Sequence, residues 1–146
     1  MSVITPEWLS QHIVNNAPEA IIFADRTGNI RLWNAGATAI FGYTVEETVG
    51  QSLDLIIPER QRGRHWEGYE KVMQTGVSRY GTDLLSVPAV RKDGSRLSLE
   101  FSIVLVRDEH NQPIGVAAIM RDVTKRWQEE RELKARLTAL EQKEKV

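Results

Sequence analysis

The sequence contains no cysteine, which excludes disulfide bonds, thiolate nucleophiles, zinc–thiolate sites and iron–sulfur clusters. It also lacks any apolar run near the ~20 residues of a membrane-spanning helix. The opening MSVITPEWLS has no basic start followed by an apolar run, so no signal peptide is expected. Basic residues are not in excess, with 19 Lys and Arg against 20 Asp and Glu. These absences predict a soluble, cytoplasmic protein that does not bind nucleic acid or membranes.

Catalytic signatures are missing as well. Two of the three histidines, His12 and His110, stand in a helical stretch and a turn with no motif around them. No Ser–His–Asp spacing, paired-carboxylate pattern or phosphate-binding glycine loop occurs. The stretch GRHWEG at residues 63–68 lacks the G-x-G pattern and the preceding strand of a nucleotide-binding fingerprint. We therefore do not expect an enzyme.

The chain has the length and composition of one globular domain with flanking segments. Its 146 residues are 41% hydrophobic and 27% charged, which is typical of a folded domain. A chain of ~150 residues buries roughly 70% of its unfolded surface, which is enough for a core and one ligand cavity. We expect an N-terminal cap helix over residues 1–16, a core over 17–122 and a C-terminal helix over 123–146.

Short-range patterns predict an α+β core. Helical or irregular signals lie at residues 35–43, 44–50, 52–58 and 59–74. Strand signals lie at residues 20–25, 30–34, 79–91, 95–108 and 114–122. Gly28 and the Asp93-Gly94 pair mark hairpin turns. Thr44 and Glu47 have the spacing of a capping box.

Two periodic patterns indicate which side chains face inward. His65 shares one helical face with Tyr69, Val72 and Met73, at spacings of 4, 7 and 8 residues. In the strand over 95–108, apolar side chains alternate with polar ones and place Phe101 and Ile103 on the inner face. The strand over 114–122 is apolar on both faces. We therefore expect the outer face of the sheet to be covered, either by the N-terminal helix or by a second subunit.

The order of these elements and several motifs resemble the PAS family of sensory domains. The motifs are APEAIIFADRTGNIRLWNAGATAIFGY, EETVGQSL, IIPER, RKDG and MRDVT, spread over roughly residues 10–124. The resemblance implies a PAS fold, in which a five-stranded antiparallel sheet carries short helices on one face. Helices flank the sheet at both ends of the chain. Family members sense light, redox state, gases or metabolites, or only dimerise, so the fold does not decide the function.

The resemblance also points to a cofactor. The segment PERQRGRHWEGY is similar to the part of bacterial oxygen-sensing histidine kinases in which a helix histidine holds haem iron. His65 falls on that position and is implied as the axial ligand of haem b. A neutral imidazole suits this role and leaves the other axial position free for a diatomic gas. Light sensing through a flavin–cysteine adduct, as in other family members, is excluded because there is no cysteine, whereas a flavin held without a covalent bond stays open.

Other positions of the resemblance give the remaining candidate site. Lys71 and Arg79 fall where those sensors place polar partners of the haem propionates. The implied apolar and distal wall comprises Tyr80, Leu85, Phe101, Ile103 and Ile119, with Tyr69 beside the histidine. Leu85 replaces the distal arginine that those sensors bring to bound O2. CO or NO therefore stays open as the sensed gas. A hydrogen bond from Tyr80 in place of the arginine is a further alternative.

A second interpretation of the same residues stays open. A histidine in this helix can be half-buried without binding anything, and Lys71 and Arg79 can be solvated charges. The chain would then be a PAS domain that binds another small molecule or no ligand and acts as a dimerisation or protein-interaction module. In both interpretations we expect a homodimer through the N- and C-terminal helices. The signal would pass through residues 121–124 into the last helix and on to a downstream signalling protein.

Overall fold

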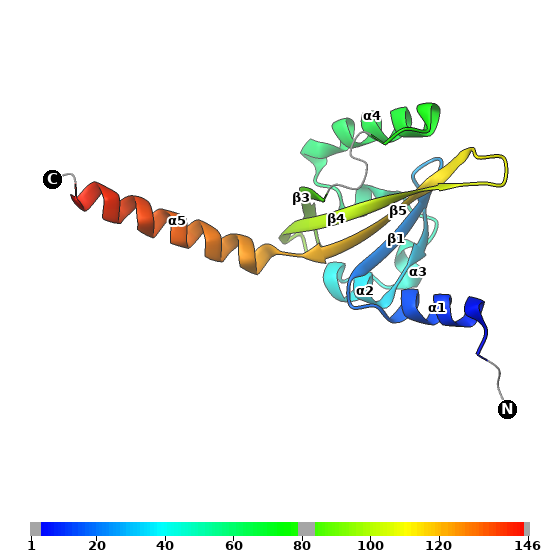
Figure 1. Ribbon diagram of the computed structural model, residues 1–146, viewed down its shortest axis with the longest axis horizontal. Coiled ribbons are helices and arrows are strands. Elements are labelled where there is room, and N and C mark those ends of the chain that lie inside the picture. Colours follow the sequence, from blue (N-terminus) through cyan, green and yellow to red (C-terminus); the bar gives the residue numbers. More distant parts are fainter. Residues whose placement is uncertain (1–3, 79–83, 145–146) are drawn as a thin grey trace.

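The computed structural model describes residues 4–78 and 84–144. Its strands form one antiparallel sheet in the order β2-β1-β5-β4-β3 (Figure 1), so the expected α+β architecture is confirmed. The strands are β1 (Ala20–Asp25), β2 (Ile30–Trp33), β3 (Leu85–Val90), β4 (Arg96–Arg107) and β5 (Pro113–Asp122). The helices are α1 (Pro6–Asn16), α2 (Ala35–Phe41), α3 (Val45–Thr48), the 3-10 helix η1 (Leu53–Ile56), α4 (Glu59–Thr75) and α5 (Thr124–Glu144).

Local sequence signals set most of these boundaries. Thr5 caps α1 by accepting a hydrogen bond from the Trp8 backbone, and Pro6 is the first helical residue. Thr44 and Glu47 form the expected capping box at the start of α3. Helix α4 ends at Gly76, whose φ of 69° is the left-handed conformation that glycine adopts most readily. Strand β3, an edge strand, begins only at residue 85, while the strand signal started at 79; residues 79–83 lie outside the described residues.

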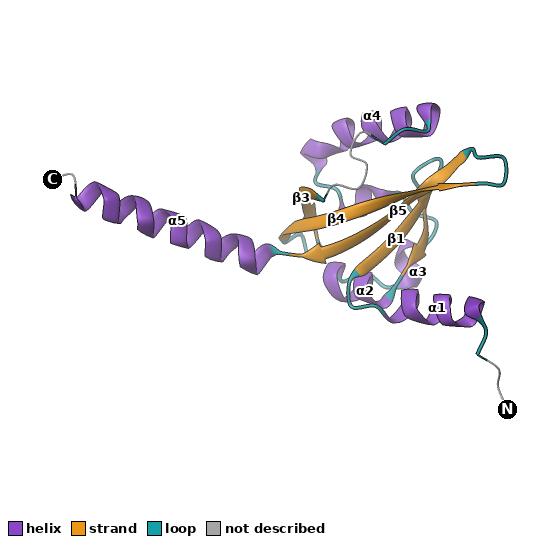
Figure 2. Ribbon diagram, viewed as in Figure 1, coloured by secondary structure: helices purple, strands orange, loops and turns teal. Residues whose placement is uncertain are grey.

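The hydrophobic core lies between the sheet and the short helices, which Figure 2 distinguishes from the strands by colour. The antiparallel register pairs Phe101 with Met120 and Ile103 with Ala118, which places these side chains on that face. The core also includes buried residues from β1, α2 and η1, among them Ile22, Phe41 and Ile56. The inward orientation predicted for Phe101 and Ile103 is confirmed, and both are partly buried against this core.

A single buried asparagine joins the N-terminal part of the chain to the sheet. Asn34, which is 2% exposed, caps α2 by accepting a hydrogen bond from the Ala37 backbone at 2.9 Å. Its Oδ1 also accepts from the backbone N–H of Ile21 at 2.8 Å, in β1. Its Nδ2 donates to the carbonyl oxygens of Val14 at 2.8 Å and Glu19 at 3.0 Å. One side chain therefore connects the end of α1, the start of β1 and the start of α2.

Helix α1 does not cover the outer face of the sheet. None of its residues is buried, and it lies beside α2 (Figure 1). Its apolar side chains Trp8, Leu9 and Ile13 are 48%, 45% and 59% exposed. The prediction that the N-terminal helix covers the outer face of the sheet is therefore wrong. The hydrogen bonds of Asn34 instead hold the end of α1 near α2. Among the described residues no helix is both long enough and apolar enough to cross a membrane.

Candidate functional site

Helix α4 carries His65, the candidate protein ligand of haem iron. Two aromatic residues fix this helix to the rest of the domain. The Trp66 indole N–H donates to Asp54 Oδ1 at 2.7 Å, which connects α4 to η1. The Tyr69 hydroxyl lies 2.5 Å from the Asp25 carbonyl oxygen and 3.1 Å from that of Ala24, at the end of β1. Burial is the main cause that raises the pKa of Tyr69 to about 12, so the hydroxyl keeps its proton. The Tyr69 hydroxyl therefore donates to the end of β1, although the sequence suggested Tyr69 as a cofactor contact.

The position of the Trp66 ring depends on a glycine, Gly28, in the hairpin between β1 and β2. Gly28 has φ of 83°, and a Cβ atom there would lie 2.2 Å from two carbons of the Trp66 ring. We expect Gly28→Ala to lower the free energy of unfolding by about 3 kcal/mol, since it combines left-handed strain with a clash. Gly50→Ala is the matched control: its φ is 91° but no atom lies within 4 Å of the added Cβ. The control is expected to lose only about 1 kcal/mol in urea unfolding. Equal losses in the two variants would contradict a Trp66 contact of this kind.

His65 points one nitrogen into the protein and leaves it without a partner. Its Nδ1 atom is buried and makes no hydrogen bond with any described residue. The ring packs edge-on against Trp66, with centroids 4.6 Å apart, and lies tilted to Tyr69 at 5.8 Å. Burial lowers the pKa of His65 below its usual range, although the Asp54 carboxylate acts in the opposite direction. The ring is therefore neutral near pH 7, as a metal ligand must be.

A second buried atom without a partner lies one helical turn before His65. Gln61 Oε1 is buried and also makes no hydrogen bond with any described residue. Residues four apart lie on the same face of a helix, so both unsatisfied atoms belong to one side of α4. Buried polar atoms normally find a partner, which a ligand or water would supply here. The sequence pattern did not indicate Gln61, because a glutamine in the first turn of a helix is ordinarily a surface residue.

The sheet brings part of the predicted apolar wall together. Leu85 pairs with Phe101 across β3 and β4, and Ile103 follows on the same face. These three side chains are half-buried, whereas Leu99 on the same face is fully buried. Ile119 pairs with Ser102 and so lies on the opposite face. The structure therefore does not bring Ile119 together with the other wall residues.

The positions suggested for the propionates are not assembled in the structure. Lys71 is exposed on α4 and forms no ion pair with the described residues. Arg79 and Tyr80 lie outside the described residues. Two surface hollows are lined by described residues, one along α5 and one beside Asp25 and Asp108, and neither includes His65. The described residues contain no cluster of three or more His, Cys, Asp or Glu side chains that could hold a metal ion.

Of the candidate residues, the histidine fits a haem group. A half-buried imidazole with one buried, unpartnered nitrogen can serve as the protein ligand of haem iron. Trp66 and Tyr69 on α4, and Phe101 and Ile103 on β4, all pack against the same core cluster. When bound, haem would supply iron chemistry, and His65 would hold it. The apolar residues on the sheet would exclude water from its faces.

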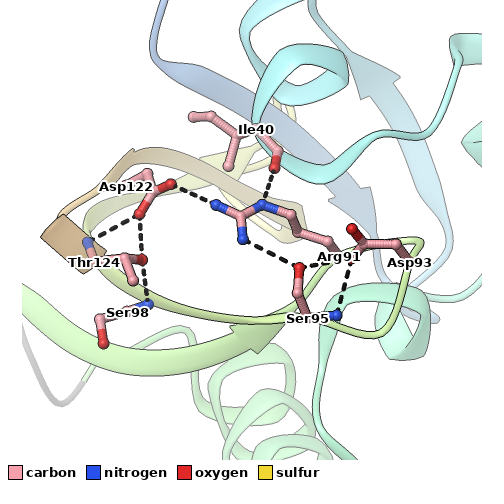
Figure 3. Close-up of polar contacts among 7 residues, drawn as sticks. All are labelled: Ile40, Arg91, Asp93, Ser95, Ser98, Asp122 and Thr124. Carbon is pink, nitrogen blue, oxygen red and sulfur yellow. Dashed lines mark hydrogen bonds and ion pairs between the residues drawn. The ribbon is translucent and has the colours of Figure 1, made fainter.

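A second cluster of polar residues lies where the sheet passes into α5 (Figure 3). Arg91, in the hairpin between β3 and β4, donates to the Ile40 carbonyl oxygen at 3.1 Å, where α2 ends, and to Asp122 Oδ2 at 3.0 Å. Asp122 Oδ1 accepts hydrogen bonds from the backbone and hydroxyl of Thr124. The Thr124 hydroxyl oxygen in turn accepts the Ser98 N–H at 2.9 Å. The motifs RKDG and DVT thus meet in space, although 27 residues or more separate them in the chain; we name this cluster the junction.

Comparisons with known proteins agree with this architecture. A family model described as PAS fold matches residues 14–128. The sensor protein FixL of Bradyrhizobium diazoefficiens is 29% identical over 107 residues, covering 68% of this chain and 20% of FixL. A PAS domain structure from Colwellia psychrerythraea has a TM-score of 0.69 at 24% identity, covering 80% of this chain and 98% of that one.

A structure described as an RNA-binding light-oxygen-voltage receptor has a TM-score of 0.70 at 18% identity, covering 94% of this chain and 40% of that one. At these identities the two structures show a shared fold and nothing further about function. The chain spans a fifth or less of the length of the curated relatives that it matches.

Proposed function

The chain belongs to the PAS family, and from this premise we propose that it is a sensory module that binds haem b through His65. A diatomic gas or a change of redox state at the haem would be the signal. The observation that carries the proposal is the buried, unpartnered Nδ1 atom of His65 in a ring whose pKa is lowered by burial. The similarity to the sensor protein FixL supports the sensory role.

Titration with haem tests this proposal directly. We expect the purified protein to bind haem at one equivalent per chain and to develop a Soret band and a visible spectrum of a histidine-ligated haem. Exposure of the reduced form to CO would shift the band, because His65 would be the one protein ligand and would leave the iron able to bind a gas. A protein that stays colourless with excess haem would overturn the haem assignment.

The junction is the proposed route from the site to α5. It fixes the first turn of α5 to β4, β5 and the end of α2, so movement of the sheet reaches the helix. We expect Arg91→Ala to loosen this connection by about 1–2 kcal/mol, because three hydrogen bonds are lost at a group about one-third exposed to screening solvent.

Hydrogen exchange of the Val123 amide, which donates to the Ser98 carbonyl oxygen at 2.9 Å, measures the loosening. Exchange should become roughly tenfold faster in Arg91→Ala. Lys92→Ala is the control, since the Lys92 side chain pairs with Glu47 and makes no hydrogen bond to Ile40, Asp122 or Thr124. Unchanged exchange in Arg91→Ala would remove Arg91 from the proposed route.

A second candidate function is a dimerisation or protein-interaction module with another ligand or none. It is favoured by the apolar side chains that α1 and α5 leave exposed, including Trp8, Ile13, Leu133 and Leu137. The homodimer through these helices is part of both proposals. The two functions differ in whether His65 holds haem, which the haem titration decides.

A further inference from the structure

Two buried side-chain atoms of α4 lack a hydrogen-bond partner, and the two are chemically complementary. Among the described residues, Gln61 Oε1 and His65 Nδ1 are the only buried side-chain nitrogen or oxygen atoms in this state. The amide oxygen can only accept a hydrogen bond, whereas a neutral imidazole carries one proton that either ring nitrogen can hold. A protonated Nδ1 is therefore the donor that Gln61 lacks. Leaving both atoms unpaired is unfavourable, because buried polar groups have lost their bonds to water.

The two side chains are within reach of one another. Residues four apart on a helix lie on one face, with Cβ atoms roughly 6 Å apart. Both side chains are partly buried, so they turn toward the domain from the same side of α4. Neither atom is paired in the structure, and a hydrogen bond between them requires rotation of the side chains. Glutamine has three rotatable side-chain bonds, so this rotation does not require movement of the helix backbone.

Other acceptors near the ring are already engaged. The Asp54 carboxylate, which acts on the pKa of His65, uses Oδ1 to accept the Trp66 indole N–H at 2.7 Å. The backbone carbonyl oxygens at the end of β1 accept the Tyr69 hydroxyl. Gln61 Oε1 is therefore the one buried side-chain acceptor that the described residues leave unused.

The shape of the imidazole decides which nitrogen can serve iron. Nδ1 adjoins the ring carbon that is joined to the backbone, so a flat macrocycle bound there would meet the helix. Nε2 lies at the far end of the ring. A histidine that binds a metal almost always donates its other ring N–H to an acceptor, which fixes the tautomer and raises the basicity of the ligand. A proton on Nδ1 leaves the lone pair of Nε2 for the iron.

We propose that Gln61 is a positioning residue, which accepts a hydrogen bond from Nδ1–H of His65 and so presents Nε2 to haem iron. The inference rests on the proposed function and adds the residue that selects the tautomer of the ligand. Coordination withdraws electron density from the ring and makes Nδ1–H a stronger donor. The hydrogen bond and the coordination therefore strengthen each other, and Gln61 acts only through His65.

The tautomer of His65 in the haem-free protein tests the hydrogen bond. Long-range proton–nitrogen NMR at pH 8 distinguishes the two neutral forms, and free histidine prefers the proton on Nε2. We expect the Nδ1–H form in the wild type and the Nε2–H form in Gln61→Met, which keeps the length of the side chain and removes the acceptor. Gln74→Met is the matched control, because Gln74 is exposed near the end of the same helix and donates to Glu70 at 3.4 Å. The control should keep the Nδ1–H form.

The haem-bound protein gives a second readout. Gln61→Met should weaken haem binding about tenfold, as loss of a partner of a metal ligand does. It should also raise the reduction potential, because a less basic imidazole favours reduced iron. Gln61→Glu supplies a stronger acceptor and should lower the potential while keeping the Nδ1–H form. Circular dichroism verifies the fold, and a residue that acted only on the fold would not shift the potential in opposite directions.

The outcomes separate this inference from the proposed function. An Nε2–H form in the wild type, or the same form in the wild type and Gln61→Met, would overturn the role of Gln61 even if haem binds. Equal potentials in the two Gln61 variants would overturn it as well. A wild-type protein that stays colourless with haem would overturn the proposed function and the iron role of Nε2. The NMR result would then still decide whether Gln61 holds the ring.

Discussion

Replacing Asn34 with alanine is expected to lower the free energy of unfolding by about 4 kcal/mol. The side chain is fully buried and serves backbone groups from three separate segments. Alanine would leave the N–H groups of Ile21 and Ala37 and the carbonyl oxygens of Val14 and Glu19 without these bonds. Each buried group left unpaired costs about 1–3 kcal/mol, reduced where water can enter.

Two further variants define the origin of this loss. Asn34→Asp keeps the shape and the acceptor but places a carboxylate oxygen where Nδ2 now donates to carbonyl oxygens. It should destabilise the protein as much as alanine does. Asn16→Ala removes an exposed asparagine that donates to the His12 carbonyl oxygen at 2.9 Å, and should cost less than about 0.5 kcal/mol. Urea unfolding of the four proteins measures the differences, and a loss below 1 kcal/mol in Asn34→Ala would contradict the role of this residue.

The role of Asn34 was not predictable from sequence patterns, whereas the elements around it were. Alternation and turn residues gave strand β1 at its observed bounds, and the Thr44–Glu47 spacing gave the capping box of α3. These are local signals, within a few residues along the chain. The partners of Asn34 lie as far as 20 residues away, at Val14, so their meeting depends on the completed fold. Arg91 and Asp122, 31 residues apart, are hidden from local patterns for the same reason.

The candidate site was predicted in part, and the errors have clear physical causes. Helical periodicity placed His65 on the inward side of α4, and alternation placed Phe101 and Ile103 on the inner face of the sheet. Strand β5 is apolar on both faces, so its own pattern could not show on which side Ile119 lies. Register against β4 puts it on the outer face. The Tyr69 hydroxyl donates hydrogen bonds to backbone carbonyl oxygens of β1. Helical periodicity shows which side of a helix faces inward, but it does not show such hydrogen bonds to a distant strand.

Replacing His65 with alanine is expected to abolish the Soret band of a histidine-ligated haem, because the imidazole would be the sole protein ligand to the iron. His12→Ala is the matched control: His12 is exposed on α1, where it stacks on Trp8 with centroids 4.7 Å apart. It should keep the full spectrum. Free imidazole added to His65→Ala should restore the band, since the space left by the ring accepts a small ligand. A full spectrum in His65→Ala would assign the iron to another residue.

The pH dependence of haem binding follows from the burial of the same ring. A proton and the iron compete for the imidazole, so binding weakens as the pH falls through the pKa of the histidine. Burial lowers the pKa of His65 below 6.5, and the loss therefore moves to lower pH. The Soret band should be constant from pH 8 to pH 6.5, where an exposed histidine would already be half protonated. An NMR titration of His65 without haem provides the independent measurement, and a midpoint at or above 6.5 would contradict a ring buried in its neutral form.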